Sequence, residues 1–115
     1  MGATVFEINQ YMVIWRQMER RDFDGVEVKV RGMVRCIGDE YSMDIIFVAP
    51  DSPNPDPIFD KEKQKGFMFM PVSDMPGFVD LLRNEKPIFG HLRDDRPEWT
   101  SITTSQEPVG EGETL

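Results

Sequence analysis

The chain has 115 residues, a formal net charge of −8 at pH 7 and a single cysteine, Cys36. This length fits one domain, and one cysteine excludes an intrachain disulfide. The acidic balance disfavours bulk binding to nucleic acid, because such binding depends on neutralising phosphates.

The sequence also bears on where the protein works. No run of residues is long and apolar enough to span a bilayer. The N-terminus lacks the basic and then apolar segments of a signal peptide. A lone cysteine suits a reducing compartment. We therefore expect a cytoplasmic protein with no membrane contact.

The first expected element is a helix over residues 4–21. Thr4 and Glu7 fit a capping box at its start. Apolar residues then recur at helical spacing, namely Val5, Ile8, Met12, Trp15 and Met18. A long strand is the alternative, because Tyr11, Val13 and Ile14 are residues that favour sheets.

Residues 26–37 and 41–49 are predicted to be two strands joined by the turn Gly38-Asp39-Glu40. The alternation places one row of the first strand inward: Val26, Val28, Val30, Gly32, Val34 and Cys36. In the second strand the inward row is Tyr41, Met43, Ile45 and Phe47, with Ser42 and Asp44 outside. Two such strands with a short connection predict an antiparallel hairpin whose outer face is at least partly wet.

Residues 50–65 interrupt this pattern and are predicted to form a long loop. Prolines at positions 50, 53, 55 and 57 cannot donate to a strand ladder, and a solvated charge run follows them. Ile58 and Phe59 are the apolar anchors of this loop. They could pin it to the domain or contact a partner.

The stretch from Gly66 to Leu92 predicts strand, helix and strand. Residues 67–70 are apolar on both faces, as expected of a strand covered on both sides. Ser73 or Asp74 could cap a helix that has Pro76 in its first turn and ends before Pro87. Residues 88–92 and 99–103 are predicted strands, and residues 105–115 a flexible acidic tail.

These elements predict a single α+β domain over residues 1–104. We expect an antiparallel β-sheet of about five strands, with an N-terminal helix and a second helix between strands packed on one face.

The apolar cluster of the central stretch has two interpretations. Such residues usually form a core. Met-rich patches, however, also adapt to varied protein ligands. On the second interpretation the partner-binding residues are Phe59, Phe67, Met68, Phe69, Met70, Met75 and Trp99.

A nucleic-acid site is the alternative from a different class. Lys29, Arg31 and Arg35 share the predicted outer face of one strand. Small sheets that bind single strands combine such a basic face with aromatic stacking platforms. That face lacks aromatic residues unless Trp99 or Tyr41 lies beside it.

Catalytic and metal sites have weak support in the sequence. Cys36 could act as a nucleophile with His91, the only histidine, as its base, but Cys36 is predicted to be buried, where a thiol is usually inert. Asp94, Asp95 and Glu98 cluster at one turn without a calcium-loop pattern. We therefore expect no metal and no cofactor. A small enzyme or ligand-binding domain that uses His91 remains a further alternative.

The hypothesis that follows is a non-catalytic, acidic protein-interaction module, homodimeric and of the inhibitor, immunity or chaperone type. Apolar side chains would supply the binding energy, and the acidic surface would select a basic protein partner.

Overall fold

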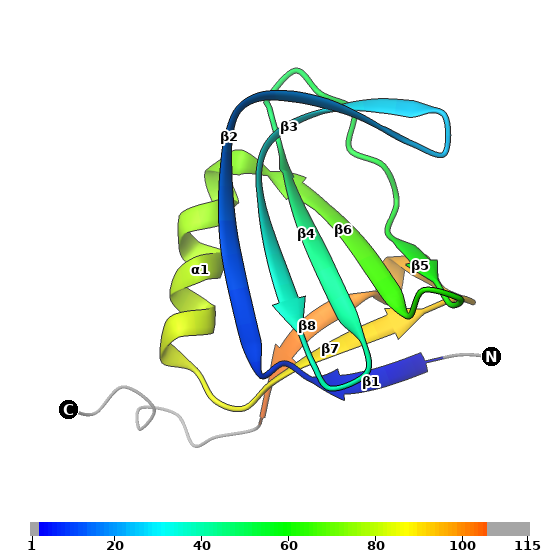
Figure 1. Ribbon diagram of the computed structural model, residues 1–115, viewed down its shortest axis with the longest axis vertical. Helices are drawn as coiled ribbons and strands as arrows, with labels where there is room; N and C mark the ends of the chain where they lie inside the picture. Colours follow the sequence, from blue (N-terminus) through cyan, green and yellow to red (C-terminus); the bar gives the residue numbers. More distant parts are fainter. Residues whose placement is uncertain (1–2, 106–115) are drawn as a thin grey trace.

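The computed structural model describes residues 3–105, which form two sheets, one α-helix and two short 3-10 helices (Figure 1). The mixed α+β class is as predicted. The strands are β1 (Ala3–Glu7), β2 (Gln10–Phe23), β3 (Val26–Ile37), β4 (Ser42–Val48), β5 (Ile58–Asp60), β6 (Lys65–Pro71), β7 (Ile88–Arg93) and β8 (Ser101–Thr104). Helix α1 spans Met75–Asn84, and the 3-10 helices η1 and η2 span Val72–Asp74 and Pro97–Trp99. The predicted tail lies outside the described residues from position 106 onward.

The larger sheet has five strands in the order β2-β3-β4-β6-β5. The predicted β3–β4 hairpin is confirmed, since these strands pair antiparallel. The prediction of a purely antiparallel sheet is wrong, because β4 and β6 pair in parallel. A second sheet, which the sequence did not predict, has the order β1-β7-β8.

The predicted N-terminal helix is wrong, because residues 4–21 belong to β1 and β2. β1 pairs with β7 in the small sheet, and β2 pairs with β3 in the large one. Ile8 and Asn9 make the change of sheet, where their amides donate to the carbonyls of Ile88 and Ile37. Pairing on two different sheets outweighs a helical spacing that the sequence shows only locally.

One face of the large sheet is covered by both α1 and the small sheet. Met75 and Leu82 of α1 and Phe6, Ile88 and Leu92 of the small sheet share a core cluster with five residues of the large sheet: Val34, Cys36, Met43, Ile45 and Phe47. Figure 1 shows α1 running alongside β2 and the small sheet crossing the lower end of the large one. We call this the helix face.

The opposite face has its own apolar cluster, to which none of the described helices contributes a residue. Its buried members are Phe23, Val28, Val30, Met33, Ile46, Val48 and Phe69. Phe23 comes from the far end of the long β2–β3 hairpin, which curves over the sheet in Figure 1. Its ring lies 4.9 Å from the ring of Phe69, centroid to centroid. We call this the open face.

The prediction that one row of β3 side chains points inward along the whole strand is wrong, because β3 contains a bulge. The pairing of β3 with β4 shifts between Val30 and Gly32. As a result Val28 and Val30 pack in the open-face cluster, whereas Val34 and Cys36 pack on the helix face. The predicted wet outer face of β4 is wrong as well, since Asp44 and Ile46 are fully buried.

The central stretch largely matches its prediction. β6, α1 and β7 follow each other as expected, and β6 ends at Pro71. Neither predicted cap acts as one, because no side chain hydrogen-bonds the amides at the start of α1. The loop over residues 50–65 contains the short strand β5, where Ile58 pairs with Phe67. No helix within residues 3–105 has the length and apolar character needed to cross a membrane.

Candidate interaction surface

The most exposed apolar side chains of the described residues gather on β2. Seven large hydrophobic residues are exposed, and four of them lie on this strand: Tyr11, Met12, Trp15 and Met18. Trp15 is 62% exposed and Met18 is 73% exposed. In the described part of the chain β2 has one neighbour in its sheet, β3, so its other edge has no partner strand. A long apolar edge of this kind is a template for pairing with another chain.

The pairing of β2 with β3 fixes which way its side chains point. Tyr11 lies opposite Cys36, and Trp15 lies opposite Gly32, so both are on the helix face. A Cβ added to Gly32 would meet the thioether of Met75 in α1, which confirms this orientation. Met12 and Ile14 alternate with them, and Ile14 packs against the open-face cluster. Apolar groups therefore emerge on both sides of the β2 edge.

A cavity of about 450 Å³ lies between the start of β2 and the end of α1. Gln10 and Tyr11 line it from β2, and Leu82, Arg83 and Lys86 line it from α1 and the residues that follow. The acidic residues Glu7 and Glu85 also line it, so the cavity carries charges of both signs. This space could receive side chains from a strand added beside β2.

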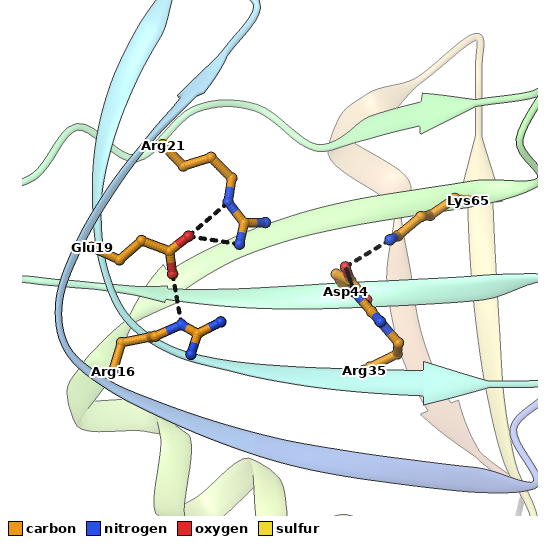
Figure 2. Close-up of polar contacts among 6 residues, drawn as sticks. All are labelled: Arg16, Glu19, Arg21, Arg35, Asp44 and Lys65. Carbon is orange, nitrogen blue, oxygen red and sulfur yellow. Dashed lines mark hydrogen bonds and ion pairs between the residues drawn. The ribbon is translucent and has the colours of Figure 1, made fainter.

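Three charged residues in the distal half of β2 are paired with each other. Arg16 Nε donates to Glu19 Oε1 at 2.9 Å, and Arg21 donates to Glu19 Oε2 at 2.7 and 3.0 Å (Figure 2). Burial tends to raise the pKa of Glu19, but the hydrogen bonds from Arg21 and Arg16 outweigh it, so the pKa lies below its ordinary value. Glu19 thus links two arginines of β2 at the place where the pairing of β2 with β3 is interrupted, between Trp15 and Glu19.

A second polar cluster lies inside the sheet. The fully buried Asp44 accepts two hydrogen bonds from Arg35, at 2.8 and 3.1 Å, and an ion pair from Lys65 at 3.0 Å (Figure 2). These three residues come from β4, β3 and β6, which are neighbours in the sheet. The hydrogen bonds to Asp44 raise the pKa of Arg35. The cluster therefore ties three adjacent strands together through one carboxylate.

Most of the predicted partner-binding residues belong to the interior. Met75 is fully buried and Phe69 nearly so. Phe59, Met68 and Met70 are half-buried against the helix-face core, and Phe67 against the open-face cluster. Trp99 is the exception, being 54% exposed with the guanidinium groups of Arg93 and Arg96 each 4.9 Å from its ring centroid. The structure thus brings these residues together mainly as core.

The three predicted nucleic-acid residues do not share one face. Arg35 is held by Asp44, and Lys29 donates to Asp51 at 2.7 Å. Arg31 sits within the β3 bulge and reaches the backbone carbonyl of Arg16. The bulge breaks the alternation on which the prediction of a common face depended.

The candidate catalytic residues, and two of the three candidate metal-binding residues, are either buried or hydrogen-bonded to neighbouring side chains. Burial, and secondarily the charge of Asp44, raises the pKa of the Cys36 thiol to about 12, so the thiol stays protonated at neutral pH. His91 lies on β7 of the other sheet, and its Nε2 is 2.8 Å from the Thr103 hydroxyl. Asp95 is hydrogen-bonded by Arg93, and Asp94 by Lys61. Within residues 3–105 no group of three or more ligating side chains could hold a metal ion.

Comparison with protein families, curated proteins and solved structures gave no significant match. The case for the surface therefore depends on its own geometry.

The sequence did not lead us to predict β2 as a surface, although one signal was available. The segment QYMVIW, residues 10–15, has no charged residue in a chain that is 30% charged.

Proposed function

We propose that the protein is a non-catalytic protein-interaction module that binds through the free edge of β2. The observation that supports this most directly is the concentration of exposed large apolar side chains on one unpaired edge strand. A partner strand laid along this edge would gain main-chain hydrogen bonds, and Trp15, Met12 and Tyr11 would lose their contact with water. The buried aromatic anchor would supply most of the binding energy.

The charge distribution supports a division of roles. Residues 10–37 carry six basic and four acidic side chains, a net charge of +2. The rest of the chain carries seven basic and seventeen acidic side chains, a net charge of −10. The acidic remainder would speed the encounter with a basic protein, while the apolar edge would supply the contact itself.

The test places a photo-crosslinking amino acid at position 15 and, as a matched control, at the exposed tryptophan position 99. We expect a specific protein adduct at position 15 and not at position 99. The captured protein is then purified and titrated against the wild type and Met12→Lys. Weakening of about tenfold or more by Met12→Lys would support the proposal. Equal adducts at both positions, or equal affinity for both proteins, would refute it.

Single-strand nucleic-acid binding is the second candidate, and one observation favours it. In the structure an exposed aromatic residue, Trp15 of β2, lies on the strand beside the basic strand β3. Arg31 of β3 donates a hydrogen bond to the backbone carbonyl of Arg16, the residue that follows Trp15. Exposed aromatic rings beside cations are the elements of a single-strand site.

The nucleic-acid candidate is tested by fluorescence anisotropy with a labelled single-stranded oligonucleotide. It requires that Trp15→Ala and Lys29→Glu with Arg31→Glu each weaken binding, and that binding fall steeply with salt. Val5→Ala is the control for loss of an exposed apolar group elsewhere. Absence of binding at low salt would eliminate this candidate.

A further inference from the structure

We propose that the strand that pairs with β2 is β2 of a second copy, in a two-fold antiparallel arrangement centred near Val13. This rests on the proposed function of the β2 edge, and it assigns that edge to a second copy in place of a basic protein. The two large sheets would become one continuous sheet of ten strands, with both α1 helices on the same side. Such an interface is isologous, so it closes at two copies.

The first argument is that the β2 edge needs a cover. The segment Gln10–Trp15 contains no charge, no proline and no glycine, and it is rich in β-branched and aromatic residues. Exposed edges of this composition aggregate unless they are covered. The other outer strands of the two sheets are much shorter, with five residues in β1, three in β5 and four in β8. β2 therefore stands apart as the edge with most to gain from pairing.

The second argument is electrostatic. Two copies that each carry a net charge of −8 repel each other, least where the local charge is not acidic. The β2–β3 hairpin with its turn, residues 10–37, is that region, with a net charge of +2. On β2 itself Arg16 and Arg21 are already paired with Glu19, and Arg20 lies 3.6 Å from Glu27 of β3. Two β2 edges can therefore meet without bringing unpaired charges together.

The third argument concerns register. Residues 10–15 pair regularly with β3, and the irregularity follows Trp15. An axis at Val13 places Tyr11 of one copy opposite Trp15 of the other, both on the helix face. It places Met12 opposite Ile14 on the open face. Each exposed aromatic ring then gains an aromatic cross-strand neighbour, a pairing that stabilises sheets.

The first measurement is molar mass by light scattering over a concentration series. We expect twice the chain mass of 13.3 kDa for the wild type, and the single chain mass for Met12→Lys with Trp15→Lys. Val5→Lys is the matched control, because Val5 is 55% exposed on the outer strand of the other sheet, and it should stay dimeric. The added lysines reduce the net negative charge, so loss of the dimer could not come from overall repulsion.

The second measurement tests the register. Tyr11→Cys and Trp15→Cys variants with different tags are mixed and treated with a mild oxidant. The native Cys36 is buried, with its pKa raised to about 12, and does not compete. We expect disulfides between the two different variants and few within either one, because equivalent positions lie about 14 Å apart in this register.

A wild type that stays monomeric at about 100 µM, or a mass that grows without limit, would overturn the two-fold pairing. Disulfides formed equally within each variant would overturn it too. A monomer that still gives an adduct with another protein at position 15 would leave the proposed function standing. The failure of the second copy as partner is thus distinguishable from the failure of the β2 edge as a surface.

Discussion

Asp44 is the residue on which the polar interior of the large sheet depends. We expect Asp44→Asn to lower the free energy of unfolding by about 2 to 3 kcal/mol, because Arg35 and Lys65 would lose a buried anionic partner. The estimate stays below the range for a fully buried pair, since both cations are partly exposed. Urea unfolding measures the change.

Asp51→Asn is the control for the Asp44 experiment, since Asp51 pairs with Lys29 at the exposed surface. We expect no measurable change in its unfolding free energy. A loss as large as that of Asp44→Asn would contradict the importance of burial at Asp44.

Glu19 makes stability depend on pH. Its folded-state pKa is lowered from an ordinary value of 4.5, so its stabilising contribution is present above that value and is lost as the pH falls through the folded-state pKa. We expect Glu19→Gln to cost about 1 kcal/mol at neutral pH and progressively less on acidification. Thermal unfolding of both proteins from about pH 7 to about pH 3 measures this. A constant difference across the series would contradict the assignment.

At Gly32 the side chain of Met75 from α1 lies directly against the backbone of β3. A Cβ there would lie 2.6 Å from the Met75 Sδ and 3.3 Å from the Ile14 carbonyl oxygen. Since Met75 is fully buried and has little room to move, we expect Gly32→Ala to cost about 1 to 3 kcal/mol. Gly77→Ala is the control, because no atom lies within 4 Å of its added Cβ. Equal stability of the two variants would show that Met75 can yield.

At the scale of elements, the residues of the apparent helical stripe explain the failure of that prediction. Four of its five members are exposed in the structure: Val5, Met12, Trp15 and Met18. A stripe indicates a helix only when its apolar residues face a core. Here their spacing across two strands coincided with a helical period, whereas the strand preference of Tyr11, Val13 and Ile14 was the better guide.

Other elements could be predicted because local and long-range signals agreed. β3 and β4 alternate clearly, and prolines mark the ends of β6 and of the helical segment. The β3 bulge, the parallel β4–β6 pairing and the small sheet have no local signal, since each depends on which strands meet in space. For the same reason the sequence is compatible with both a core and a surface role for Met75 and Phe69.

The methionines show how placement divides one residue type into two roles. We expect Met75→Ala to lower the free energy of unfolding by about 2 to 5 kcal/mol, because it leaves a cavity between α1 and the sheet. Met18→Ala should change it by less than about 0.5 kcal/mol, because its side chain is already exposed. Denaturant unfolding with light scattering separates loss of stability from loss of association. Comparable destabilisation by both variants would contradict the division.

At the scale of the whole molecule, the uneven charge distribution gives each hypothesis a different salt dependence. The acidic majority of the surface makes two copies repel at long range, while the β2–β3 pair carries the local positive excess. The negative field of the acidic surface opposes self-association, whereas the local positive field of the β2–β3 pair favours single-strand binding. Salt weakens both fields, so its effect on association has opposite signs in the two cases.

We expect the dimer to become tighter as sodium chloride rises from about 0.1 M to about 1 M, because the Debye length shortens from about 10 Å to about 3 Å and screens the repulsion. Sedimentation or light scattering at fixed protein concentration should show dissociation constants that fall about threefold or more. The control is Lys63→Glu, which adds negative charge at an exposed turn beside β5, the opposite edge of the large sheet from β2, and should steepen the salt dependence. A dimer that weakens with salt would mean that ion pairs between copies dominate the interface, contrary to the uncharged edge proposed for it.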